Sequence, residues 1–176
     1  MPGSGPSHVQ VTEGDITKIV ADAIVNAANA ELLAGGGVCG AIFRAAGAED
    51  LAKACRAIGG CPTGQAVITP TFGIGSAKHI IHAVGPVYGR YAPEEARRLL
   101  RQAYSASIRL GAEHGCTSLA FPAISTGIYG YPLDEACREA VDVCAQDGDD
   151  AGISIQLVAF DARTAAALRQ ALEAAA

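Results

Sequence analysis

The chain has 176 residues, of which 50% are apolar, and a formal net charge of −5. This length fits a single domain, since domains usually have roughly 100–200 residues, and the apolar content supplies a large core, which excludes a mainly disordered chain. The negative charge argues against nucleic-acid binding through a basic surface, so any phosphate would have to be held by local backbone geometry.

The sequence also shows no sign of a membrane segment, an export signal or a metal site. Its apolar runs are all far shorter than the ~20 residues that cross a bilayer, and its first seven residues lack the apolar stretch of a signal peptide. The six cysteines have no zinc-site spacing. We therefore expect a cytoplasmic monomer with reduced thiols, no metal, no cofactor and no membrane contact, in which residues 1–7 are flexible and residues 8–176 form the domain.

Apolar segments rich in β-branched residues alternate with helical patterns along the whole chain, which predicts an α/β fold with a mixed sheet of about six strands between two helical layers. In chain order, the predicted elements are strands at His8–Thr12 and Ala23–Asn26, helices at Gly40–Ala46 and Glu49–Ala57, strands at Gln65–Thr69 and His79–Ala83, a helix at Pro93–Glu113, a strand at Ser118–Pro122, a helix at Asp134–Ala145, a strand at Ile153–Ala159 and a helix at Arg163–Ala174. The polar, glycine-containing stretch Gln146–Gly152 is predicted to be a loop.

The segment after the second predicted strand is rich in glycine and small polar residues. It contains Asn26 and Asn29, and then Gly35–Gly40 leads directly into a helical pattern. Backbone N–H groups can crowd around an anion at such a helix start, because glycine has no Cβ and the helix dipole favours negative charge. The alternative is a merely flexible connection. The GxGxxG pattern of dinucleotide-binding proteins is also matched, but eight residues separate its glycines from the strand that they should follow directly.

A second such segment, Phe121–Pro132, follows the fifth predicted strand. Successive amides from Ser125 to Tyr129 can form a nest around a diphosphate, with the hydroxyls of Ser125 and Thr126 as further donors. Tyr129 and Tyr131 would be aromatic walls of the site, although such tyrosines are more often ordinary core or surface residues.

Two shorter segments lie at the ends of the first and last predicted strands. Asp15, in Gly14–Thr17, either caps a short helix or accepts a hydrogen bond from an exocyclic amine such as that of adenine. Phe160 offers a ring for stacking and is equally well explained as a core residue.

Taken together, these segments resemble the macrodomain family, in particular its hydrolases of ADP-ribosylated proteins and of O-acetyl-ADP-ribose. The resemblance extends from Val9 to about Leu168 and is carried by six motifs in a fixed order. These are GDIT at Gly14–Thr17, DAIVNAAN at Asp22–Asn29, GGGVCGAI at Gly35–Ile42, CPTGQAVIT at Cys61–Thr69, HAVGP at His82–Pro86 and FPAISTGIYGYP at Phe121–Pro132.

The resemblance implies an ADP-ribose site in which Asp15 and Ile16 meet the adenine, and Phe160 lines its pocket. The Ser125–Tyr129 loop would wrap the diphosphate, and Asn26 would support the site from below. The implied ligand-binding residues are Asp15, Ile16, Asn29, Gly35, Gly36, Gly37, Val38, Ser125, Thr126, Gly127, Ile128, Tyr129 and Phe160. The implied catalytic residues are Asn29, Gly37 and Cys39, and the implied partner is ADP-ribose or an ADP-ribosylated protein or nucleic acid.

One departure from the family pattern concerns catalysis. The related hydrolases usually read GGGVDGAIH, whereas this chain has Cys39 in place of the Asp and Phe43 in place of the His. We therefore expect water to be activated by a phosphate oxygen of the substrate or by Asn29, with positioning supplying much of the rate. The alternatives are a non-catalytic ADP-ribose reader, a nucleophilic role for Cys39 and, as a third function, a nicotinamide-dependent dehydrogenase.

Overall fold

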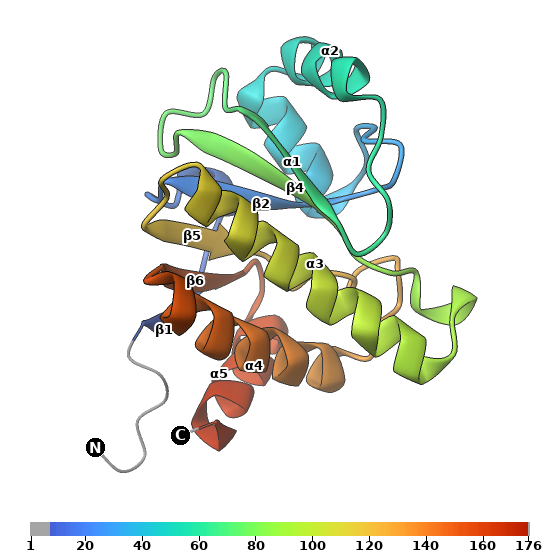
Figure 1. The fold of residues 1–176 in the computed structure, drawn as a ribbon, viewed down its shortest axis with the longest axis vertical. Helices are drawn as coiled ribbons and strands as arrows, with labels where there is room; N and C mark the ends of the chain where they lie inside the picture. Colours follow the sequence, from blue (N-terminus) through green and yellow to red (C-terminus); the bar gives the residue numbers. More distant parts are fainter. Residues whose placement is uncertain (1–7, 176) are drawn as a thin grey trace.

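The computed structural model describes residues 8–175, which form a six-stranded sheet with helices on both faces (Figure 1). The predicted flexibility of residues 1–7 lies outside the described residues. The strands are β1 (Val9–Glu13), β2 (Ala23–Ala28), β3 (Ala66–Pro70), β4 (His79–Val84), β5 (Ser118–Phe121) and β6 (Ser154–Ala159). The helices are α1 (Gly37–Ala46), α2 (Ala48–Ile58), α3 (Pro93–Glu113), α4 (Leu133–Ala151) and α5 (Ala162–Ala174), with short 3₁₀ turns η1 (Ile16–Lys18) and η2 (Tyr88–Arg90). The predicted class, α/β with a mixed sheet, is confirmed.

The strands follow the order β1-β6-β5-β2-β4-β3 across the sheet. All neighbouring pairs are parallel except β3, which runs antiparallel to β4 at one edge. The carboxyl ends of the parallel strands therefore share one rim, and the loops that follow β1, β2, β4, β5 and β6 all begin there. In open α/β sheets this rim is where ligands bind.

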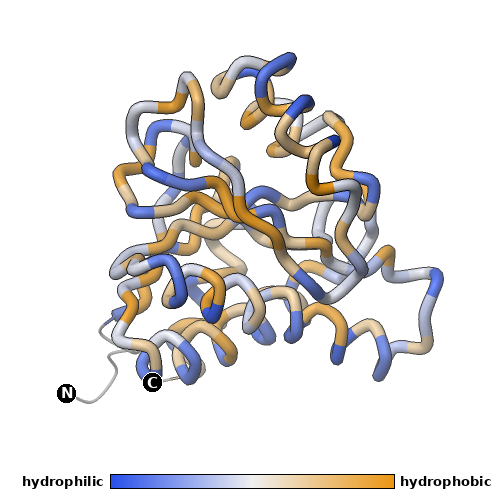
Figure 2. Tube along the Cα trace, turned by 45° about the horizontal axis from the view of Figure 1, so that its top comes forward, coloured by the Kyte–Doolittle hydropathy of each residue, from blue (hydrophilic) through white to orange (hydrophobic). Residues whose placement is uncertain are grey.

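Two apolar cores cover the two faces of the sheet, because alternate strand residues point to opposite sides. On β2, Val25 belongs to the core formed with α3, α4 and α5, whereas Ile24 belongs to the core formed with α1 and α2. On β4, Ile81 belongs to the first of these cores and Ile80 to the second. Figure 2 shows the hydrophobic strand segments in the middle of the molecule and hydrophilic residues recurring along the helices.

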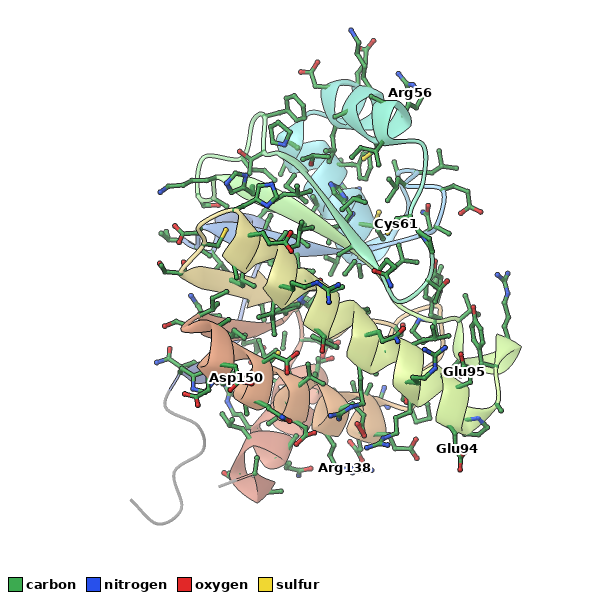
Figure 3. All side chains as sticks on the ribbon, in the orientation of Figure 1. Arg56, Cys61, Glu94, Glu95, Arg138 and Asp150 are labelled. Carbon is green, nitrogen blue, oxygen red and sulfur yellow. The ribbon has the colours of Figure 1, made fainter. Side chains whose placement is uncertain are left out.

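Charged side chains lie on the periphery, as labelled residues such as Arg56 on α2, Glu94 on α3 and Asp150 on α4 illustrate (Figure 3). Within residues 8–175, no helix combines the length and the apolar character needed to cross a membrane.

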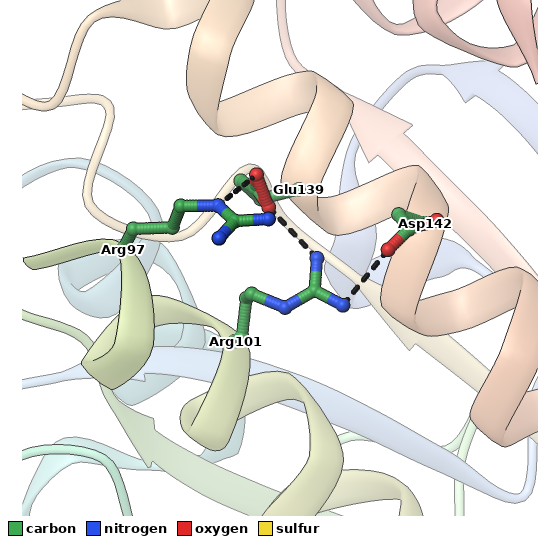
Figure 4. Close-up of polar contacts among 4 residues, drawn as sticks. All are labelled: Arg97, Arg101, Glu139 and Asp142. Carbon is green, nitrogen blue, oxygen red and sulfur yellow. Dashed lines mark hydrogen bonds and ion pairs between the residues drawn. The ribbon is translucent and has the colours of Figure 1, made fainter. Parts of the chain in front are cut away.

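An ion-pair network joins α3 to α4 on the outer surface (Figure 4). Glu139 accepts hydrogen bonds from Arg97 Nε at 2.6 Å and from Arg101 Nη1 at 2.7 Å, and Arg101 Nη2 reaches Asp142 Oδ2 at 2.8 Å. An exposed pair alone contributes little, but Glu139 is only 15% exposed and shared between two arginines, so the network fixes how the two helices lie against each other.

The predicted loop at Gln146–Gly152 is wrong, because α4 continues to Ala151. Gly148 lies inside this helix and is buried against β6, where an added Cβ would come within 2.8 Å of Ile155 Cδ1. The glycine therefore allows close packing rather than breaking the helix. The helix ends at Ala151 and is capped by Gly152, which adopts the left-handed conformation with φ 68°.

Candidate functional site

A pocket of about 270 Å³ opens at the rim where the carboxyl ends of the parallel strands meet. Its walls come from two loops, Asn29 to Cys39 after β2 and Pro122 to Tyr129 after β5, with Phe160 at the end of β6. A second hollow of about 430 Å³ adjoins it and is bordered by Gly14, Asp15 and Ile16 after β1. The two hollows share Gly37, Val38, Pro122, Val158 and Phe160. Together they form one elongated cleft.

The Asn29–Cys39 loop is held by the side chain of Asn29. Its Nδ2 donates to the carbonyl of Leu33 at 2.9 Å, and its Oδ1 accepts from the amide of Leu33 at 2.9 Å. Gly40, in the first turn of α1, lets the loop fold back onto the helix, because an added Cβ would lie 2.4 Å from the carbonyl oxygen of Gly35. Gly37, where α1 begins, has φ +56°, a conformation that favours glycine.

The start of α1 presents unpaired backbone donors to the pocket. The first N–H groups of a helix have no intrahelical acceptor, and within residues 8–175 the amides of Gly37, Val38 and Cys39 donate to no protein acceptor. All three residues line the pocket. A row of free amides at a helix start is a site for an anion.

The Ser125–Tyr129 loop supplies a second row of donors. Among the described residues, the amides of Gly127, Ile128 and Tyr129 have no acceptor in the protein, and all three residues line the pocket. The predicted donor role of the two hydroxyls does not hold in this structure. Ser125 Oγ donates to the carbonyl of Pro86, and Thr126 Oγ1 to that of Ala123, each at 2.8 Å. The hydroxyls therefore fix the loop, and the main chain faces the pocket.

Gly85, which directly follows β4, is a site residue that the prediction missed. It lines the pocket, and an added Cβ would lie 2.3 Å from Ser125 Oγ and 2.5 Å from Ile124 Cγ2. The absence of a side chain at this position therefore allows the Ser125–Tyr129 loop to approach the end of β4. The HAVGP motif contains this glycine and was the available signal. Thr164 also lines the pocket and was not singled out.

The aromatic residues divide between the cleft and the core. Tyr129 is half-buried and lines the pocket, and burial raises the pKa of its hydroxyl, with smaller contributions from Glu31 and Cys39. Tyr131 was predicted to be a second wall, but it is 4% exposed and packs against Tyr88 with 4.7 Å between ring centroids. Phe160 is 71% exposed and borders both hollows, so its ring is open to a stacking partner.

Asp15 caps η1, as the first of its two predicted roles required. Its Oδ1 accepts from the amide of Thr17 at 2.9 Å and from the Thr17 hydroxyl at 2.7 Å, and these bonds lower the pKa of the carboxyl. The side chain is thus ionised at neutral pH, beside the buried Ile16. It is the only charged residue that borders either hollow among the residues the structure describes, and no lysine or arginine lines the cleft.

Cys39 lies at the floor of the pocket and is 6% exposed. Its thiol donates to the carbonyl of Leu33 at 3.6 Å and accepts from Asn26 Nδ2 at 3.8 Å. Burial raises the pKa of this thiol above its ordinary value, so it is neutral at pH 7. Phe43 is 2% exposed and belongs to the core against α1 and α2, which leaves no acid or base at either departure from the family pattern.

Asn26, which the resemblance implied as a support, does not line the pocket but contacts Cys39, which does. Asn26 is fully buried on β2, and its amide also contacts the buried His82 on β4. The prediction did not single out His82, although the HAVGP motif begins with it.

The model of the Macro domain family matches residues 25–140, which include most of β2, both wall loops of the pocket and the elements between them. The chain belongs to the macrodomain family.

Three similar proteins agree with this membership. The O-acetyl-ADP-ribose deacetylase of Salmonella typhimurium is 53% identical over 139 residues, which cover 77% of this macrodomain and 76% of that protein. The Oceanobacillus iheyensis macrodomain with ADP superposes with a TM-score of 0.88 at 37% identity, over 94% of this chain and 90% of that one. The Trypanosoma brucei macrodomain in complex with ADP-ribose gives a TM-score of 0.84 at 32% identity, over 96% of this chain and 72% of that one.

Proposed function

We propose that this macrodomain binds ADP-ribose and hydrolyses ADP-ribose esters. The observation that carries the proposal is the pair of donor rows, Gly37–Cys39 and Gly127–Tyr129. Their unpaired amides border one pocket, and no basic side chain lines it among residues 8–175. Backbone nests of this kind hold phosphate groups. The Oceanobacillus macrodomain with ADP and the Trypanosoma macrodomain with ADP-ribose support ADP-ribose as the ligand. The Salmonella relative, an O-acetyl-ADP-ribose deacetylase, supports an ester as the substrate.

The two adjoining hollows suit the two ends of this ligand. In the proposed pose, the adenine lies in the hollow bordered by Asp15, Ile16 and Phe160, where the Asp15 carboxylate accepts from the exocyclic amine. The diphosphate lies between the two donor rows. The distal ribose then reaches Asn29, Gly37, Cys39 and Tyr129, and any attached acyl group lies at that end.

Hydrolysis in this pose requires a water molecule at the ester carbonyl. The water oxygen bonds to the acyl carbon, the bond from that carbon to the ribose oxygen breaks, and the ribose oxygen takes up a proton. Both polar atoms of Asn29 already hold the backbone of Leu33, and Cys39 is neutral. A phosphate oxygen of the substrate is therefore the favoured proton acceptor for the water, and positioning supplies the rate.

The substrate class includes O-acetyl-ADP-ribose and mono-ADP-ribose attached to acidic side chains of proteins. Both carry an ester at the distal ribose, so one site and one mechanism serve both. An ADP-ribosylated nucleic acid would enter only if its attachment leaves the same ester geometry, because the described part of the chain lines the cleft with no basic residue that could hold a nucleic-acid backbone.

A non-catalytic reader of ADP-ribose is the second candidate function, and the neutral thiol at position 39 favours it. Calorimetry with ADP-ribose tests binding, and acetate release from O-acetyl-ADP-ribose together with label release from a Glu-linked ADP-ribosylated protein tests hydrolysis. We expect binding and release, with release slowed at least tenfold in Asn29→Ala because the Leu33 loop loses its anchor. Binding without release above the buffer rate would identify a reader, and absence of binding would reject both functions.

A further inference from the structure

A chain of buried hydrogen bonds crosses the sheet and ends at the floor of the pocket. Asn26 on β2 and His82 on β4 are paired in register, and both are fully buried. Asn26 Nδ2 lies 3.1 Å from His82 Nδ1 and 3.8 Å from Cys39 Sγ. On the other side of the imidazole, His82 Nε2 lies 2.9 Å from Thr69 Oγ1 on β3. The chain thus connects an edge strand to residue 39.

The direction of each hydrogen bond follows from the groups involved. Asn26 Nδ2 can only donate, so His82 Nδ1 accepts and the ring proton lies on Nε2. This proton is donated to Thr69 Oγ1, whose hydroxyl in turn donates to the carbonyl of Pro70 at 3.1 Å. Burial lowers the pKa of His82 to about 4, so at neutral pH the ring is uncharged and its Nδ1 lone pair is available.

Both N–H groups of the Asn26 amide have hydrogen-bond partners, whereas its oxygen has none among the described residues. One N–H is accepted by His82 and the other is directed at Cys39, whereas Oδ1 is buried without a partner among residues 8–175. A buried acceptor without a donor is unfavourable. The two donor bonds, to His82 and to Cys39, hold the amide in this orientation although its Oδ1 is left unpaired.

We propose that His82 and Asn26 are positioning residues for the side chain at position 39. His82 fixes the plane of the Asn26 amide, and the second N–H of that amide then points at residue 39 and requires an acceptor there. Cys39 meets this requirement with its sulfur lone pair and directs its own S–H to Leu33, in the loop held by Asn29. The predicted effect on turnover rests on the proposed function, but the hydrogen bonds to Cys39 can be tested without measuring turnover.

The first test measures ionisation of the Cys39 thiol from the pH dependence of its alkylation by iodoacetamide, with the modified peptide quantified by mass spectrometry. Thr69→Val removes the acceptor of the Nε2 proton with little change in shape, and His82→Phe removes the acceptor of Asn26. We expect the alkylation midpoint to rise by about one pH unit in both variants, because the Asn26 amide is no longer held in the plane that directs its second N–H at the thiolate, so this donor stabilises the thiolate less. The titratable neighbours of the thiol, Cys55 and Tyr129, are unchanged in both, as is the Gly35 N–H that also lowers the pKa of the thiol.

Ser107→Ala is the matched control. Ser107 is equally buried and donates to the carbonyl of Ala103 at 2.8 Å within α3, and it borders neither hollow. This variant should lose stability but keep the wild-type midpoint. ADP-ribose should protect the thiol in every variant that binds it. Three outcomes would overturn the proposal. The alkylation midpoint could be unchanged in Thr69→Val, or Ser107→Ala could show the same shift. The wild-type thiol could also resist alkylation at every pH.

The second test measures hydrolysis of O-acetyl-ADP-ribose by the same variants. We expect kcat to fall about tenfold in Thr69→Val while KM and the Kd for ADP-ribose stay within about twofold, because the affected group lies at the reacting end rather than at the phosphates. A parallel loss of binding, or no loss of kcat, would contradict the positioning role. If the wild-type chain hydrolyses no ester, the proposed function fails, and the alkylation test still decides the positioning role. If His82→Phe does not fold, Thr69→Val alone carries both tests.

Discussion

Residue 39 shows how one side chain limits the chemistry of an otherwise complete pocket. The Cys39 thiol is neutral, receives one N–H from Asn26 and lies in the first turn of α1, where free amides and the helix dipole favour negative charge. A carboxylate would satisfy the same donors and could also hold or activate water.

We therefore predict that Cys39→Asp raises the kcat for O-acetyl-ADP-ribose hydrolysis by about tenfold, the lower part of the range for general base catalysis. The Kd for ADP-ribose should change by less than about threefold, because the substitution keeps the backbone amide of residue 39 and its side chain faces Asn26 and Leu33 rather than the phosphates. Cys39→Asn, which has the same size without the charge, is the control and should show no gain. Equal rates for the Asp and Asn variants would mean that position 39 is not at the reacting end.

For single residues, the sequence indicated which segments surround the cleft but not which atoms face it. Glycine-rich runs after strands predicted the positions of the two loops, because backbone donors need no side chain. The roles of the Ser125 and Thr126 hydroxyls were predicted wrongly, since the acceptor of Ser125 is the carbonyl of Pro86, which is brought near only by the fold. Tyr131 was misplaced for the same reason, because Tyr88, its packing partner, is distant in sequence.

Among the elements, the Ser125–Tyr129 loop depends on a close approach to the end of β4. An alanine methyl group at position 85 would collide with Ser125 Oγ and Ile124 Cγ2, and the Oγ atom is already held by the adjacent Pro86. The loop must then move away, which shifts the free amides of Gly127 and Tyr129 relative to α1.

We predict that Gly85→Ala weakens ADP-ribose binding at least tenfold, as measured by calorimetry, and lowers the free energy of unfolding by about 1–3 kcal/mol, the usual cost of overpacking. Gly89→Ala is the control, because Gly89 lies nearby in η2 and an added Cβ there meets nothing within 4 Å. If both variants bind ADP-ribose as tightly as the wild type, the loop does not determine affinity.

Helix α4 shows where prediction from composition fails at this scale. Gln146–Gly152 contains two glycines and three aspartates, a composition typical of loops. The segment is helical up to Ala151 because Gly148 packs directly against β6 and Gly152 provides the terminating left-handed residue. The contact with Ile155 and His8 that decides this is tertiary, and no local pattern encodes it.

For the whole molecule, the alternation of apolar strands and helical patterns predicted the class and all six strands. The order β1-β6-β5-β2-β4-β3 does not follow from that alternation, because β1 pairs with β6 from the other end of the chain. This pairing places Gly14 and Asp15 beside Phe160 at one end of the cleft. The family resemblance, rather than periodicity, implied that these residues share a site.

The buried polar chain also makes the stability of the whole molecule depend on pH in a defined window. Burial lowers the pKa of His82 from 6.5 to about 4. Above pH 6.5 His82 is neutral in both the folded and the unfolded chain and adds no pH dependence. Between pH 6.5 and 4 the unfolded chain binds a proton that the folded chain does not, so the free energy of unfolding falls as the pH falls. Below about pH 4 both states are protonated and this contribution stops changing.

We predict that the free energy of unfolding falls by about 3 kcal/mol between pH 6.5 and 4, since each unit of pKa difference corresponds to about 1.4 kcal/mol. Urea unfolding at each pH measures this loss of stability. His82→Gln should remove most of the loss, whereas His114→Gln, at an exposed histidine, should retain it. The carboxyl groups with lowered pKa, such as Asp15 and Asp22, add a further loss as the pH falls below about 5, but they are the same in the wild type and in both variants, so the difference between the variants reports on His82. A loss in His82→Gln as large as that of the wild type would show that His82 is charged in the folded state, and a charged ring could not accept the Asn26 N–H.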